Sequence, residues 1–228
     1  MQSLRLTGWS TLILALSLLA APLHAQQPAA DKEYKLINPP QKTESGKQIE
    51  VVEFFSYACP HCADFEAPLQ DWLKRKPKEV VFKPVPMVFR ESWKPLAKLY
   101  YTLDAMGVAE KYHQAVFDAI HKQKQELFTD AAVIDWAGKQ GLDKARFEAT
   151  YNSFGVDTKV QRAMAMGKAY GIQFTPAIAV NGKYWTGPSM VATSAGVDMR
   201  RFFAVVDQLI AMERGSAAEA APVPKKKS

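Results

Sequence analysis

Two cysteines, Cys59 and Cys62, are the only ones in this 228-residue chain, and Pro60 and His61 separate them. A structural disulfide explains the pair poorly, because stabilisation by a disulfide grows with the loop that it closes, and this loop is very short. Zinc needs about four ligands, and no second cysteine pair or His-x-x-x-His is present to complete a site. Covalent haem attachment needs a histidine directly after the second cysteine, where Ala63 stands. The spacing therefore predicts a redox-active dithiol that uses no metal and no other cofactor.

The residues around the pair predict unequal cysteines. The apolar run 49–55 is typical of a buried strand, and a helix is expected to open near Cys59 and Pro60, since proline is favoured at the first helical position. Unpaired backbone N–H groups and the helix dipole then favour a thiolate at Cys59. His61 is expected to add a further donor or positive charge. Cys62, one turn further along, is expected to be the more buried, resolving thiol.

The direction of electron flow follows from this asymmetry. Stabilising the thiolate stabilises the reduced protein, so its disulfide becomes a stronger oxidant. Each unit by which a thiol pKa falls corresponds to ~1.4 kcal/mol, or ~30 mV for a two-electron couple.

The rest of the chain predicts an α/β fold interrupted by helices. A second strand is expected at 80–85, ending or lying at a sheet edge near Pro84, because proline cannot donate to a sheet ladder. A third strand at 177–180 leads into Asn181-Gly182, a strong hairpin signal. Helical periodicity marks five segments between Trp93 and about Met166, the last of them expected at 156–170. A final amphipathic helix is predicted over 198–212.

Both ends of the chain have the composition of non-core segments. Arg5, the apolar run 12–20 and the sequence before Ala25 are typical of a signal peptide cleaved near Ala25, for export to the periplasm. The alternative is an uncleaved anchor, but the apolar run is shorter than the ~20 residues that a membrane span needs. The net charge is +6, and part of it lies in the terminal run 225–227. Without a basic stripe that interleaves with aromatic residues, the charge indicates no nucleic-acid role.

Two segments that lie far apart in the sequence resemble one known family. The stretch 53–62, Glu-Phe-Phe-Ser-Tyr-Ala-Cys-Pro-His-Cys, followed by Phe65-Glu66, resembles the active-site segment of the DsbA family of bacterial periplasmic dithiol oxidases. The stretch 174–177, Phe-Thr-Pro-Ala, followed by 180–184, Val-Asn-Gly-Lys-Tyr, resembles the cis-proline loop and hairpin of that family. The resemblance extends over roughly residues 34–212.

This resemblance implies a thioredoxin-like α/β fold with an inserted all-helical subdomain. The expected division is a signal peptide at 1–25, a leader with a first edge strand at 26–48, and a thioredoxin-like domain formed by 49–90 and 167–214. The helical insertion occupies 91–166, and a disordered basic tail follows at 215–228.

The resemblance also implies roles for particular residues. Pro176 would form a cis peptide bond with Thr175 and pack against the disulfide, and the Thr175 backbone would pair with an extended substrate. The alternative for Pro176 is an ordinary proline that opens a strand. DsbA proteins often have valine where this chain has Thr175. This difference bears on the redox potential and on substrate release.

Acidic residues are implied beneath the dithiol. The family places a glutamate, here Glu53, near a lysine, here Lys83, and this pair would buffer the proton of Cys62. The alternative is a glutamate exposed at the end of a strand. Glu66 would add to the same charge network. His113 and His121 are expected to be solvated helix positions.

The implied activity is a thiol:disulfide oxidoreductase that donates the Cys59–Cys62 disulfide to exported proteins with free cysteines. A DsbB-type membrane quinone reductase would reoxidise the dithiol, and the protein would act as a monomer. The alternative is an isomerase or reductase, but such periplasmic proteins typically add an N-terminal dimerisation domain. A third hypothesis is a binding protein or chaperone whose cysteines are incidental. It predicts that Cys59→Ser leaves function intact.

Overall fold

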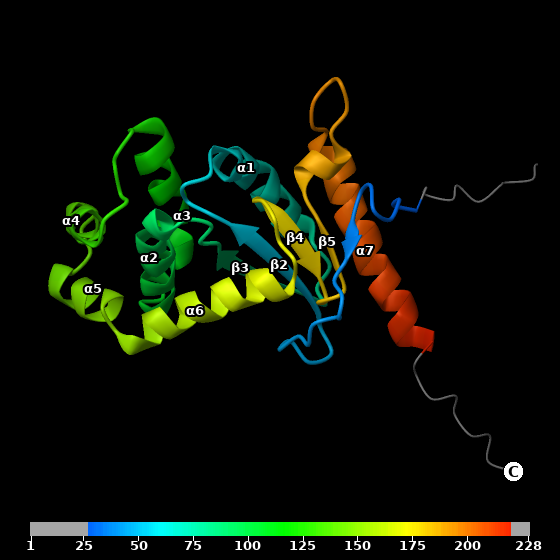
Figure 1. Cartoon of the computed structure of the whole chain (residues 1–228), viewed down its shortest axis with the longest axis horizontal. Coiled ribbons are helices and arrows are strands. Elements are labelled where there is room, and N and C mark those ends of the chain that lie inside the picture. Colours follow the sequence, from blue (N-terminus) through cyan, green and yellow to red (C-terminus); the bar gives the residue numbers. More distant parts are fainter. Residues whose placement is uncertain (1–26, 220–228) are drawn as a thin grey trace, which may run out of the picture.

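The structure is a computed structural model that describes residues 27–219 (Figure 1). The predicted signal peptide with its cleavage near Ala25, and the terminal lysines 225–227, lie outside the described residues. The strands are β1 (Lys35–Leu36), β2 (Ile49–Phe55), β3 (Val80–Pro86), β4 (Ala177–Val180) and β5 (Tyr184–Thr186). The α-helices are α1 (Pro60–Arg75), α2 (Lys94–Ala105), α3 (Ala109–Phe117), α4 (Asp130–Lys139), α5 (Lys144–Tyr151), α6 (Phe154–Ala169) and α7 (Met199–Glu219). Shorter helical turns are η1 (Glu91–Trp93), η2 (Asp118–Lys122, a π-helix) and η3 (Pro188–Val191).

The five strands form one mixed sheet in the order β1-β5-β4-β2-β3. Strand β2 pairs with β3 in parallel and with β4 antiparallel, and all seven of its residues are buried. Strand β3 lies at the edge, as its prolines predict, because a proline in the sheet interior would leave a ladder position without a donor. The strand that leads to the dithiol is therefore held on both sides by neighbours.

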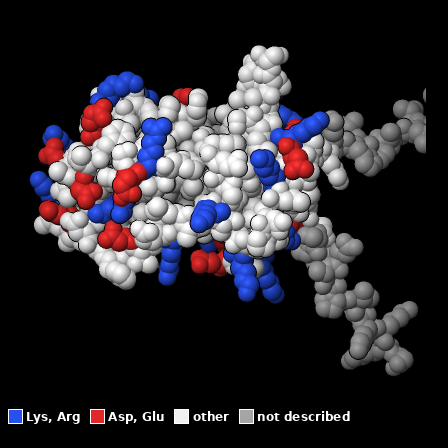
Figure 2. Space-filling view, viewed as in Figure 1, with Lys and Arg blue, Asp and Glu red and all other residues white. Residues whose placement is uncertain are grey.

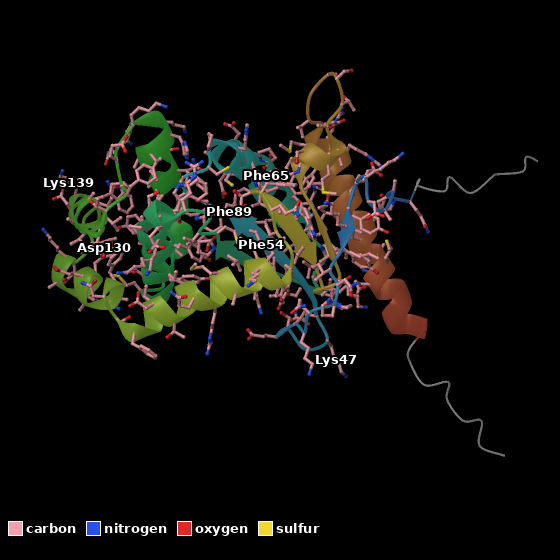
Figure 3. The ribbon with its side chains drawn as sticks, viewed as in Figure 1. Lys47, Phe54, Phe65, Phe89, Asp130 and Lys139 are labelled. Atoms are coloured by element: carbon pink, nitrogen blue, oxygen red, sulfur yellow. The ribbon has the colours of Figure 1, made fainter. Side chains whose placement is uncertain are left out.

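Helices cover both faces of this sheet. Because side chains alternate along a strand, Val51 on β2 packs in a cluster with α1 and α7, whereas Val52 packs in a cluster with α6. Phe65 of α1 belongs to the first cluster and Phe54 of β2 to the second, and both are labelled in Figure 3. The sheet is thus the middle layer of three, which confirms the predicted α/β class.

The helices α2 to α5 form a third cluster beside the sheet, to the left in Figure 1. Thr129, Asp143 and Ser153 each accept a hydrogen bond from a backbone N–H in the first turn of α4, α5 and α6, respectively. The Ser153 cap explains why α6 begins at Phe154, two residues before the predicted start. Helix α7 runs to Glu219, past the predicted helix end at 212 and into the segment expected to be a tail. No helix within residues 27–219 combines the length and the apolar character needed to cross a lipid bilayer.

The predicted hairpin joins β4 to β5. Asn181 and Gly182 have φ values of 50° and 66°, the left-handed region that an Asn-Gly turn favours, and the Lys183 N–H donates to the Val180 carbonyl at 3.1 Å. Gly182 is also tightly packed, because a Cβ built on it would lie 2.1 Å from the carbonyl oxygen of Gln41. The backbone N–H of Gln41 donates to the Gly182 carbonyl at 2.8 Å, so the two segments cannot separate without losing this bond.

We expect Gly182→Ala to lower the free energy of unfolding by more than about 2 kcal/mol, because it adds a backbone clash to left-handed strain. Gly141→Ala is the matched control. Gly141 has a φ of 82°, and a Cβ there would meet nothing within 4 Å. Strain alone should then cost about 1 kcal/mol. Urea unfolding of both variants measures the difference, and equal losses would show that the contact with Gln41 contributes nothing.

Candidate active site

The local sequence places Cys59 at the start of α1. Cys59 is the N-cap residue, with extended backbone angles of φ −92° and ψ 116°, and Pro60 occupies the first helical turn. The backbone N–H of Cys62 donates to the Cys59 carbonyl at 3.1 Å. No acidic residue lies in the first turn of α1, so no carboxylate competes with a thiolate for the positive end of the helix.

The environment of Cys59 favours its ionised form. The pKa of the thiol falls from 9.0 to about 5. The hydrogen bond from the Cys62 side chain lowers it most, and burial opposes the change. The Thr175 side chain and the backbone N–H groups of Cys62 and His61 lower it further. The His61 side chain is exposed, and the residue's contribution to this lowering is the hydrogen bond of its backbone N–H.

Cys62 has the opposite character. It is buried, with 1% of its surface exposed, and burial raises the pKa of its thiol well above 9.0. The hydrogen bond and charge of Cys59 raise this pKa further, and the negative charge of Glu53 adds to the effect. At neutral pH the reduced pair is therefore a thiolate at Cys59 beside a thiol at Cys62.

A loop from the far end of the sequence completes the site. The peptide bond between Thr175 and Pro176 is cis, as the resemblance implies, and Pro176 is buried directly before β4. Cys59 Sγ lies 3.4 Å from the Thr175 carbonyl oxygen, across 116 positions of sequence. The antiparallel pairing of β4 with β2 brings the two segments together.

Glu53 is buried, and its charge acts on Cys62, but its predicted partner is wrong. Lys83 pairs in register with Val52 and Glu53 with Pro84, so the side chains of Lys83 and Glu53 emerge on opposite faces of the sheet. Lys83 Nζ instead lies 2.6 Å from Glu50 Oε2, on its own face. Glu53 is 2% exposed, which also excludes the alternative of a surface glutamate. Burial, and then the negative charge of Glu66, raise the pKa of Glu53 well above 4.5.

The charge of Glu66 acts on Glu53, and His113 contacts Glu66. His113 Nε2 is 3.3 Å from Glu66 Oε2, and Gln70 Nε2 donates to Glu66 Oε1 at 2.7 Å. Burial would raise the pKa of Glu66, but the hydrogen bonds from His113 and Gln70 and the charge of His113 bring it below 4.5. The surroundings of the two buried glutamates therefore shift their pKa values in opposite directions.

Both histidines expected to be solvated instead hold Tyr57, two residues before Cys59. The side chain of His113 is 14% exposed, and its Nδ1 lies 2.7 Å from the Tyr57 hydroxyl. His121 Nε2 donates to the Tyr57 carbonyl at 2.8 Å. The spacing contains the missed signal, because position 113 lies three and four residues before Val116 and Phe117, on the buried face of α3.

A helix-start thiolate, a buried partner thiol and a proline loop on a mixed sheet define a thioredoxin-like thiol:disulfide oxidoreductase. A sequence profile of the Thioredoxin family matches residues 46–198. The chain is 43% identical over 210 residues to the thiol:disulfide interchange protein DsbA of Bordetella parapertussis, covering 91% of this chain and 98% of that protein. It is 40% identical over 190 residues to DsbA of Burkholderia cepacia, covering 82% and 90%. The chain belongs to the DsbA family.

A solved structure agrees with this assignment. The crystal structure of Pseudomonas aeruginosa DsbA superposes with a TM-score of 0.78 at 34% sequence identity, covering 84% of this chain and 97% of that one. Because the likeness extends over nearly the whole relative, it includes the helices α2 to α6 as well as the sheet. The chain is a protein dithiol:disulfide oxidoreductase.

Proposed function

We propose that the mature protein works in the periplasm, where it donates the Cys59–Cys62 disulfide to exported proteins as they fold. The observation that carries this direction is the stabilised thiolate at Cys59, because whatever stabilises the reduced form makes the disulfide a stronger oxidant. DsbA-family proteins are themselves a standard example of a cysteine acidified in this way. The signal peptide predicted at 1–25 supports export.

The reaction consists of two exchanges. A substrate thiolate attacks Cys59 Sγ, the Cys59–Cys62 bond breaks, and its electron pair stays on Cys62, which takes up a proton. A second substrate thiolate then attacks the substrate sulfur of the mixed disulfide and releases Cys59 as a thiolate. The substrate loses two electrons and two protons. One proton ends on Cys62 and the other in water, because Cys59 stays ionised.

The loop 174–177 is positioned to receive an extended substrate. The Thr175 carbonyl lies within reach of the reacting sulfur, and Thr175 itself is partly exposed. We assign its backbone to pairing with the substrate strand, and the buried Pro176 to shaping the surface against which the sulfur packs. Pro60 starts the helix, and His61 contributes its N–H.

Charge on the visible face fits a protein that binds unfolded chains of varied sequence. Figure 2 shows acidic and basic side chains mixed over α2 to α6, without a continuous basic stripe among the described residues of this face. We propose that a DsbB-type membrane quinone reductase reoxidises the dithiol, that the protein acts as a monomer, and that 91–166 form a subdomain inserted between 49–90 and 167–214.

The test is a comparison of two assays on the same preparation. The oxidised protein should convert a reduced, unfolded substrate with several cysteines to its disulfide form stoichiometrically. When the same substrate carries scrambled disulfides, the reduced protein should restore the native activity of that substrate only slowly. If rescue of the scrambled substrate proved the faster reaction, the protein would be an isomerase rather than an oxidase.

A further inference from the structure

The acids beneath the dithiol need a counter-charge, and Lys83 does not provide it. Glu53 and Glu66 are 2% and 4% exposed, and Glu53 Oε2 has no hydrogen-bond partner among the described residues. Two adjacent buried carboxylates cannot both be ionised at low cost, so at neutral pH the pair holds one proton. Which glutamate holds that proton decides whether it is available to Cys62.

His113 contacts one member of this pair. Its Nε2 faces Glu66 Oε2 at 3.3 Å, and its Nδ1 faces the Tyr57 hydroxyl at 2.7 Å. Burial raises the pKa of Tyr57 well above 10, so the hydroxyl keeps its proton and can donate to Nδ1. The Nε2–H is then directed to Glu66. The ring is held in this orientation by edge contacts with Phe55 and Phe117.

The pair also lies in the wall of a groove. Glu53, Glu66 and His113 line one groove of about 1110 Å³, bounded by α1, β3, α2 and α3. Protons can therefore enter and leave on this side of the molecule without passing the dithiol. Other ionisable groups face the groove or the imidazole: Tyr57 before Cys59, Tyr100 and Asp104 from α2, Glu110 from α3, and Lys74, Lys76 and Lys78 at the far end.

Resting on the proposed function, we propose that His113 is a positioning residue that keeps Glu66 ionised, so that the proton of the pair resides on Glu53. During substrate oxidation Glu53 gives this proton to Cys62 and regains one from groove water. During reoxidation Glu53 first releases its proton to groove water, and the Cys62 thiol then transfers its own proton to the Glu53 carboxylate and attacks Cys59 Sγ in the mixed disulfide. The bond between Cys59 Sγ and the sulfur of the oxidant breaks, and that sulfur leaves as a thiolate. The Glu66 charge keeps Glu53 basic enough for this return.

The decisive measurement is an NMR titration of the glutamate carboxyl carbons in the reduced full-length protein, comparing wild type with His113→Gln. We expect Glu66 to bind its proton more than tenfold more tightly in the variant, with its midpoint moving up by over one pH unit. His121→Gln is the matched control, because His121 also holds Tyr57 but does not contact Glu66. An unchanged Glu66 midpoint in His113→Gln, or an equal change in His121→Gln, would overturn the proposal.

Kinetics test the link to Cys62. The reduced protein is mixed with oxidised glutathione, and release of glutathione from its mixed disulfide with Cys59 is followed against pH. In His113→Gln this step should slow about tenfold near pH 5 and less than twofold at pH 8, whereas Glu53→Gln should slow it at both. Superimposable profiles of wild type and His113→Gln would refute the role. Because glutathione replaces the protein substrate, this outcome is separate from failure of the proposed oxidase activity.

Discussion

Cys59→Ser should lower the rate at which the protein oxidises a dithiol substrate by at least about a thousandfold, because no disulfide remains for a substrate to attack. Cys62→Ser should lose turnover equally. It should, however, keep the reactive thiolate and accumulate a mixed disulfide when it is mixed with oxidised glutathione. The two variants therefore fail at different steps. Mass spectrometry of the glutathione adduct, beside an assay of substrate oxidation, distinguishes them.

Folding must be checked before these losses are interpreted. Both cysteines belong to the cluster that joins the active-site loop to α2 and α3, so near-ultraviolet circular dichroism should be compared among the reduced proteins. Persistent oxidation of substrate by a folded Cys59→Ser protein would support the hypothesis of incidental cysteines. Adduct formation in Cys59→Ser but not in Cys62→Ser would reverse the assignment of the attacking thiol.

Alkylation of reduced Cys59 should follow a titration with a midpoint near pH 5, because the pKa of this thiol is lowered to about 5. Lowering the thiol pKa from 9.0 stabilises the reduced protein by roughly 5 kcal/mol if the whole difference is realised. Solvent near the sulfur screens the interactions and reduces this stabilisation to roughly 3 kcal/mol. These two values correspond to on the order of 60 to 120 mV of added oxidising power. Equilibration with glutathione measures it.

The same ionisation makes the stability of the reduced protein depend on pH. The pKa is lower in the folded state than in the unfolded state, so the stabilisation is complete above about pH 9. It declines as the pH falls and is lost below about pH 5. The oxidised protein lacks this contribution. As the pH rises between these limits, the free energy of unfolding of the reduced protein should therefore increase relative to that of the oxidised protein. An alkylation midpoint near pH 9, or a pH-independent difference, would contradict the thiolate assignment.

Features decided within a few residues could be predicted from the sequence. Pro60 predicts the helix start at Cys59, Asn181-Gly182 predicts the turn, and the apolar run 49–55 predicts the central strand. Each of these depends on backbone preferences that nearby side chains impose, and each is present in the structure. The likeness of two distant segments to DsbA proteins also predicted that Thr175 and Pro176 would reach the dithiol.

The partners of buried charges were decided by tertiary structure alone. Lys83 and Glu53 are both strand residues, but the register of β2 and β3 sends them to opposite faces, a difference of one position that no local preference encodes. His113 reaches Glu66 only because α3 packs against α1 and the active-site loop. Local propensity determined where the thiolate forms. The three-dimensional packing determined which charges surround it, because electrostatic interactions depend on distances between segments that the sequence keeps far apart.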